Sequence, residues 1–125
     1  LDSVNSIFTY SNAGHNPPLL IRESGEIQEL DVGGFALGVV EKTEYTEKPI
    51  VLQSGDLIMF YTDGIPETRN NKNEEFGTER ITEIIQANRQ LSAKKIADSI
   101  LAELLSFRKD APQGDDYTLV IMKKL

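Results

Sequence analysis

Residues 57–64 read LIMFYTDG, and this stretch decides how the chain folds. The first five residues form the longest apolar run of the sequence and include the aromatic and branched side chains that favour β-strands. A run of this length is far shorter than the roughly 20 residues that cross a bilayer. Asp63 and Gly64 follow directly, so a carboxylate stands where the chain leaves the sheet. The stretch therefore predicts a core strand that ends in an acid at the rim of a sheet.

More strand-like segments lie on both sides of this run. Their β-branched and aromatic residues predict strands over residues 6–11, 19–22, 27–30, 46–52 and 117–123. Turn sequences separate neighbouring strands, because Ser24-Gly25 follows one segment and Ser54-Gly55-Asp56 precedes the central run. We therefore expect a mostly antiparallel sheet built from hairpins.

Helical periodicity begins only after Gly77. A short amphipathic pattern ends near Asn88, and Ser92 is placed to cap a longer helix that ends near Phe107. The predicted buried face of the longer helix contains Ile96, Ile100, Leu101, Leu104 and Phe107. Two consecutive helices packed on an antiparallel sheet, followed by a final strand, define an α+β fold.

Composition excludes several classes of function. The 125 residues include 20 acidic and 13 basic side chains, for a formal charge of −7, which repels a nucleic-acid backbone. Cysteine is absent, so disulfides and thiolate metal sites are excluded, and a metal here requires oxygen ligands or His15. The chain shows neither a basic leader nor an apolar leader, and it starts without Met. We expect one cytoplasmic domain, or part of one, from a longer parent protein, with no membrane contact by this segment.

Acidic residues stand at the ends of two predicted strands. Asp63 ends the central strand, and Asp115-Asp116 begins the last one. Two helices between them return the chain to the rim it left, so antiparallel neighbours about 4.8 Å apart would bring these acids together. Clustered carboxylates are best neutralised by a hard cation such as Mg²⁺ or Mn²⁺. The alternative is that Asp63-Gly64 is a simple β-turn and Asp115-Asp116 a polar loop before an edge strand.

Other catalytic arrangements have little support. His15 is the only histidine and lies in a Pro- and Asn-rich turn, where a hydrogen-bonding role is commoner than a role as a base. The sequence has no Gly-x-Ser-x-Gly elbow, and the glycines of residues 33–38 lack the Lys-Ser/Thr of a phosphate-binding loop. We interpret residues 33–38 as a bend.

Five motifs occur in an order that resembles a known family. They are residues 12–20 (NAGHNPPLL), 36–38 (ALG), 55–67 (GDLIMFYTDGIPE), 75–77 (EFG) and 115–120 (DDYTLV). Together they resemble the SpoIIE/RsbU branch of the bacterial PPM (PP2C-like) phosphatases.

The resemblance implies an αββα sandwich with a binuclear Mn²⁺ or Mg²⁺ site that hydrolyses phosphoserine or phosphothreonine in proteins. It assigns Asp63 and Asp115 as metal ligands, Asp116 as a ligand or a water-holding neighbour, and Gly64 as the turn of the motif. No protein nucleophile is implied, because water activated by the metals attacks phosphorus. His15 receives no role.

One part of the family pattern is missing. The family's metal-bridging aspartate lies in an Asp-x-x-Gly-His-Gly-like motif that this sequence lacks, and Asp2 has no such glycines beside it. We therefore expect residues 1–125 to be the C-terminal part of the domain and inactive alone. Such a part would expose apolar sheet surface, which predicts self-association or reliance on a further segment.

The resemblance also implies biological partners. It points to bacterial sigma-factor partner-switching, with a phosphorylated STAS-type anti-sigma factor antagonist as substrate and an N-terminal sensor or regulatory domain in the parent. The rival hypothesis is a non-catalytic PP2C-like binding module without a complete metal site.

Overall fold

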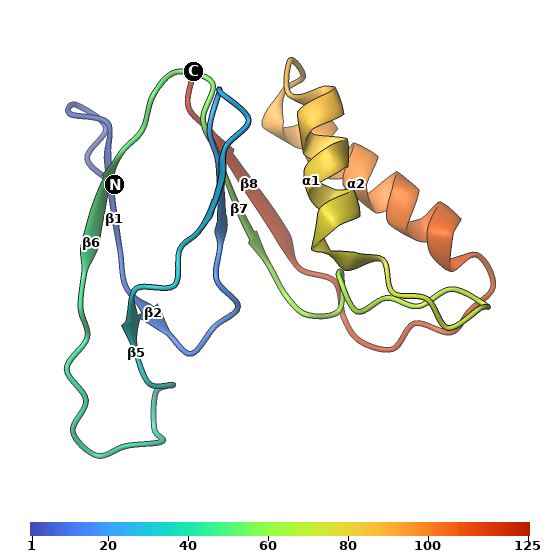
Figure 1. Ribbon diagram of the computed structural model, residues 1–125, viewed down its shortest axis with the longest axis horizontal. Helices are drawn as coiled ribbons and strands as arrows, with labels where there is room; N and C mark the ends of the chain where they lie inside the picture. The colour runs from blue at the N-terminus through green and yellow to red at the C-terminus, as the bar shows by residue number, and fades with distance from the viewer. The chain divides into compact units, whose positions relative to one another are not determined.

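The computed structural model describes residues 1–125, which form two units that we describe one at a time (Figure 1). The first unit contains residues 1–58 and 124–125, and the second contains residues 59–123. The central strand β7 (Leu57–Tyr61) begins in the first unit and ends in the second. Its main chain and side chains are almost wholly buried, as the apolar run predicts.

The first unit is built from short strands. β1 (Ile7–Tyr10) pairs antiparallel with β6 (Lys48–Val51), and β3 (Leu19–Ile21) pairs antiparallel with β4 (Ile27–Glu29). These four strands lie within the segments expected from the sequence.

The turn between β3 and β4 closes where Ser24-Gly25 predicts it. The Arg22 N–H donates to the Glu26 carbonyl at 2.8 Å, and Gly25 has a φ of 91°. A positive φ of this size is accessible to glycine at little cost, which explains the residue at this position.

One strand pair differs from the sequence interpretation. β2 (Asn12–Ala13) pairs in parallel with β5 (Gly33–Gly34), whereas we interpreted residues 33–38 as a bend. A Cβ on Gly33 would lie 1.8 Å from the Asn12 carbonyl oxygen, so the close approach of the two strands requires glycine there.

The second unit combines the end of β7 with β8 (Leu119–Lys123), α1 (Gly77–Asn88) and α2 (Ala93–Arg108). β7 and β8 are hydrogen-bonded neighbours. The Thr62 N–H donates to the Thr118 carbonyl at 3.1 Å, and the Lys124 N–H donates to the Asp56 carbonyl at 2.9 Å. Residue numbers thus rise along β7 as they fall along β8, so the two strands run antiparallel, as the connectivity predicts.

The helices follow the expected order. The Ser92 hydroxyl accepts a hydrogen bond from the Lys95 N–H at 3.4 Å and caps α2. α2 packs against both α1 and β8. Ile96, Ile100 and Leu104 form its buried face, but Leu101 is exposed, which corrects its expected place in the core. Leu101 follows Ile100 by about 100° around the helix and so points away from the sheet.

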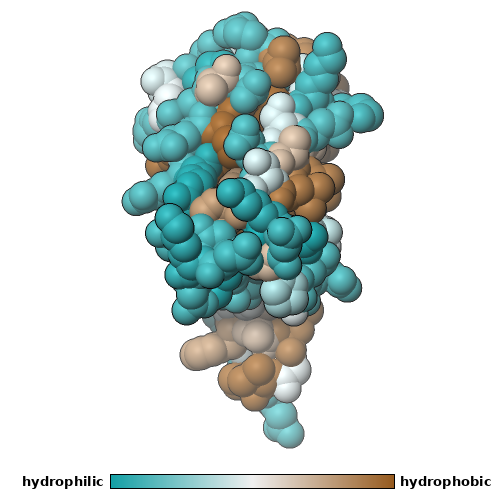
Figure 2. Space-filling view, turned by 90° about the vertical axis from the view of Figure 1, so that its right-hand side faces the viewer, coloured by the Kyte–Doolittle hydropathy of each residue, from teal (hydrophilic) through white to brown (hydrophobic).

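Large apolar side chains are exposed at several places in the first unit. Phe35, Leu37 and Val39, in the segment after β5, are largely solvent-exposed, and so is Val51 in β6. Figure 2 shows brown spheres near its lower end, beside white and teal ones, and the segment after β5 lies toward the same end in Figure 1. Exposed apolar surface is thus observed, while self-association remains a prediction.

The architecture confirms a mixed α+β fold with antiparallel strands, two consecutive helices and a final strand. None of its helices combines the length and the hydropathy needed to span a bilayer.

Candidate functional site

Thr62 joins the end of β7 to the start of β8. Besides its main-chain bond to Thr118, its hydroxyl accepts a hydrogen bond from the Thr118 N–H at 3.1 Å. The same hydroxyl donates to the Asp116 carbonyl oxygen at 3.3 Å. Thr62, which precedes Asp63, therefore holds the main chain of Asp116 in place. Sequence reasoning assigned no role to Thr62, although its position between an apolar strand and an acid was a usable signal.

Gly64 allows the segment after β7 to lie close to the segment before β8. It is buried, and a Cβ built on it would lie 2.4 Å from the Asp116 carbonyl oxygen. That distance is too short for any side chain, so only glycine allows this approach. The two strand ends therefore meet at one rim, as the order of strands and helices predicts. We call Asp63, Gly64, Asp115 and Asp116 the acidic rim.

The three acids of the rim are exposed. Asp115 uses one carboxylate oxygen to accept the Asp116 N–H at 2.7 Å, which fixes the turn before β8. Carboxylate oxygens are the donors that Mg²⁺ and Mn²⁺ prefer, so the chemistry of the rim suits such ions. The structure does not gather three or more His, Asp or Glu side chains at metal-binding spacing. Main chains converge at the rim, while a complete set of protein ligands is not assembled.

Thr68 supports the rim from the interior. Its buried hydroxyl donates to the Gly64 carbonyl at 2.6 Å and shares a hydrogen bond with the Tyr117 hydroxyl at 3.2 Å. The Glu67 N–H also donates to the Asp63 carbonyl at 3.0 Å. These contacts hold residues 63–68 in a tight turn and connect both sides of the rim.

His15 and Asp2 both serve local turns in the first unit. The His15 N–H donates to the Asn12 side-chain oxygen at 2.8 Å, and its Nδ1 lies 2.9 Å from the Asn16 carbonyl. The Asp2 carboxylate accepts hydrogen bonds from the Asn5 side chain and from the Asn5 and Val4 N–H groups, which lower its pKa. These contacts support the interpretation of His15 as a turn residue.

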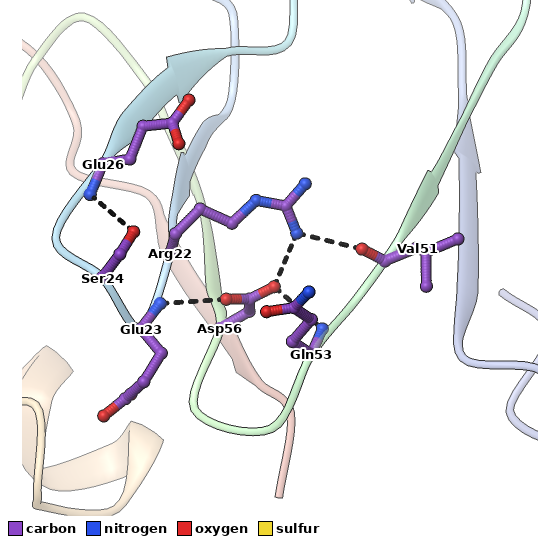
Figure 3. A network of polar contacts seen from close by, with 7 residues as sticks. All are labelled: Arg22, Glu23, Ser24, Glu26, Val51, Gln53 and Asp56. Carbon is purple, nitrogen blue, oxygen red and sulfur yellow. Dashed lines mark hydrogen bonds and ion pairs between the residues drawn. The ribbon is translucent and has the colours of Figure 1, made fainter.

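A buried aspartate, Asp56, forms a network of polar contacts in the first unit (Figure 3). Its carboxylate pairs with Arg22 at 2.7 Å and accepts the Glu23 N–H at 3.0 Å and the Gln53 N–H at 2.9 Å. The Arg22 guanidinium also donates to the Val51 carbonyl at 2.9 Å. Sequence reasoning placed Asp56 in a motif without giving it a role, because its partner Arg22 is 34 positions away.

The fold resembles solved PP2C-type domains. The SiaA-PP2C domain of Pseudomonas aeruginosa superimposes with a TM-score of 0.79 at 20% sequence identity, over 98% of this chain and 48% of that chain. At this identity the likeness shows the fold. The class defined by fold and rim is therefore a PP2C-like domain or part of one.

Comparison of the sequence with protein-family models identifies the family of this chain. The model described as "Stage II sporulation protein E (SpoIIE)" matches residues 1–124, and the chain belongs to this family. Protein IcfG of Synechocystis sp. is 32% identical over 121 residues, and the phosphoserine phosphatase RsbU of Bacillus subtilis is 27% identical over 118 residues. These matches cover 96% and 94% of this chain but only 19% and 35% of the two relatives. The chain thus spans well under half the length of either relative.

Proposed function

We propose that residues 1–125 are the C-terminal part of a metal-dependent phosphatase domain that hydrolyses phosphoserine in a protein. Membership of the SpoIIE family and similarity to RsbU, named as a phosphoserine phosphatase, support this activity. The match to 48% of a PP2C domain supports the view that further residues complete the fold. The observation that carries the proposal is the meeting of the β7 and β8 ends at an acidic rim.

In this proposal Asp63 and Asp115 bind Mn²⁺ or Mg²⁺, with two ions in the complete domain. Bound cations of this kind act as Lewis acids and lower the pKa of water near phosphorus. Asp116 adds a ligand or orients water beside the ions. Thr62 and Gly64 set the spacing between the two ligands, because they hold the Asp63 and Asp116 segments together. A further carboxylate from residues outside this chain would complete the site.

Calorimetric titration of the 125-residue chain with Mn²⁺ tests the metal site. We expect saturable binding that weakens at least about tenfold in Asp63→Asn/Asp115→Asn, since loss of two charged ligands exceeds 1.4 kcal/mol. The matched control is Asp31→Asn/Asp98→Asn, which removes the same charge from two exposed acids that are not part of the rim. Equal weakening in both double variants would show a general charge effect and contradict the site.

Phosphate release from a phosphoserine protein in Mn²⁺ tests the activity. The protein for this assay is the longer parent, because we expect the present chain alone to be inactive. Asp63→Asn should lower the rate by about 100-fold or more, as loss of charge at a metal ligand typically does. Full activity in that variant would refute the assignment.

Partner-switching belongs to the same proposal. A phosphorylated STAS-type antagonist is the substrate class, and a sensor or regulatory domain in the parent would control activity in the cytoplasm. The rival is a binding module with the same scaffold. Binding of the phosphorylated antagonist without phosphate release by the full parent would favour that rival.

A further inference from the structure

A cavity of about 520 Å³ opens beside the acidic rim within the second unit. Its walls come from the segment after β7 and from the α2–β8 connection, and it reaches both Gly64 and Asp115. The volume falls in the range of about 300–1,000 Å³ that is typical of ligand pockets. The cavity therefore offers room for neighbouring residues of a substrate as well as for a phosphoryl group.

One wall of the cavity is a small hairpin, residues 69–75. Arg69 and Glu75 form an antiparallel bridge, and the Asn70 N–H donates to the Glu74 carbonyl at 3.1 Å. Asn73 closes the turn with a φ of 63°, which asparagine tolerates better than most residues. These contacts make residues 69–75 an ordered hairpin.

The hairpin is anchored at its base. The Phe76 N–H donates to the Thr68 carbonyl at 2.8 Å, and the Gly77 N–H donates to the Pro66 carbonyl at 2.9 Å. Arg80 donates to the Glu75 carbonyl at 2.9 Å, and its guanidinium lies 4.5 Å from the centre of the Phe107 ring. Contacts from both helices thus hold the wall in place.

Arg69 is the only cationic side chain among the residues that line the cavity. Its guanidinium is held by the Glu75 carboxylate and by the Asn73 carbonyl at 3.0 Å, and its side chain is 49% exposed. A guanidinium has five N–H donors in a rigid plane, so two partners do not exhaust its capacity. Arg69 is therefore oriented in advance and retains donors for a carboxylate on a ligand.

The lining of the cavity carries two acids, Glu67 and Asp115, and one cation, Arg69 of the hairpin. With cations bound at the rim, Asp115 would face the phosphoryl group, while Arg69 supplies a positive charge from the hairpin. We infer that this cavity receives the residues flanking the phosphoserine, an inference that rests on the proposed function. Arg69 is then a specificity-determining residue that selects an acidic side chain close to the phosphoserine.

Fluorescence anisotropy with labelled phosphoserine peptides tests this inference on the 125-residue chain in Mn²⁺. The peptides differ only in carrying Asp, Asn or Lys at one position within three residues of the phosphoserine. At one or more positions we expect the Asp peptide to bind about fivefold more tightly than the Asn peptide, as a half-exposed ion pair allows. Arg69→Gln should reduce this ratio to below about twofold.

Two further variants separate recognition from hairpin stability. Lys72→Gln removes the same charge from the exposed tip of the hairpin, outside the cavity lining, and should keep the preference for Asp. Glu75→Gln breaks the ion pair but keeps the guanidinium, so it should keep or increase the preference. If Glu75→Gln instead abolishes the preference as Arg69→Gln does, Arg69 acts only through the hairpin and the inference is wrong.

The remaining outcomes distinguish this inference from the proposed function. Phosphate release by the parent together with equal binding of all peptides would overturn the role of Arg69 and leave the phosphatase intact. An Arg69-dependent preference without phosphate release would support the cavity as a binding site and overturn the catalytic proposal. Absence of binding by every peptide would overturn the inference.

Discussion

An aspartate stands near each end of β7, and the two have opposite surroundings. Asp56, before the strand, is 1% exposed and is bound by a guanidinium and two main-chain N–H groups. Asp63, after the strand, is exposed at the acidic rim. Both lie next to a glycine, so neither residue type nor neighbour distinguishes them.

The difference shows what burial demands of a carboxylate. A charge removed from water must be neutralised and its oxygens satisfied, and Arg22, Glu23 and Gln53 together meet that need for Asp56. The carboxylate of Asp56 is therefore used to stabilise the fold. Asp63 is exposed, so a cation can reach it from solvent, which is why we place function there.

The largest expected effect separates these two acids directly. Asp56→Ala leaves Arg22 without its buried partner and two N–H groups without an acceptor. It should lower the free energy of unfolding by about 3 kcal/mol, the low end for buried pairs, because the Arg22 side chain is 26% exposed. Urea unfolding measures this loss. Asp63→Ala is the control and should lower the free energy of unfolding by clearly less than Asp56→Ala, because Asp63 is exposed. Similar losses of stability in both variants would show that burial does not distinguish the two aspartates.

Gly64→Ala tests how tightly the rim is packed. The added methyl group would meet the Asp116 carbonyl oxygen at 2.4 Å, so we expect a loss of about 2 kcal/mol in urea unfolding. Gly114→Ala is the matched control, because a Cβ there meets no atom within 4 Å. A neutral Gly64→Ala variant would mean that the two strand ends are looser than the structure shows.

Thr68→Val asks whether the rim has a buried polar support comparable to the Asp56 network. The substitution keeps the shape but removes the hydrogen bonds to Gly64 and Tyr117. A loss of about 1 kcal/mol in the free energy of unfolding is expected for a neutral buried hydroxyl. Tyr117→Phe in a double-mutant cycle isolates the hydroxyl pair, and strictly additive effects would indicate that the two groups do not interact.

The smallest expected effect concerns an exposed ion pair. Lys94 and Asp98 lie 2.6 Å apart on the surface of α2, with both side chains mostly exposed. Asp98→Ala should change the free energy of unfolding by less than about 0.5 kcal/mol, because solvent screens the pair and its geometry costs side-chain entropy. A loss as large as that of Asp56→Ala would show that burial does not explain the contrast between the two pairs.

Sequence reasoning succeeded where a pattern is local and repeated. The apolar run of β7, the cap at Ser92 and the turn at Gly25 each depend on a few adjacent residues. The antiparallel pairing of β7 and β8 also followed, because two helices between the strands leave few simple paths.

Contacts between segments that are distant in the sequence were harder to predict. The pairing of β2 with β5 involves two residues on each strand, which is too few for a periodic pattern. Arg22 and Asp56 lie in two different turns, 34 positions apart in the sequence. At the rim, the acids could be named from the sequence, but the hydroxyl of Thr62 and the support from Thr68 depend on three-dimensional contacts.

The main chain of Lys124 has a practical importance for protein engineering, because it bonds the turn before β7. Its N–H donates to the Asp56 carbonyl and its carbonyl accepts the Gly55 N–H, both at 2.9 Å. Truncation before this residue would remove both hydrogen bonds from the turn that carries the buried acid. Shortened versions of the protein should therefore retain residue 124.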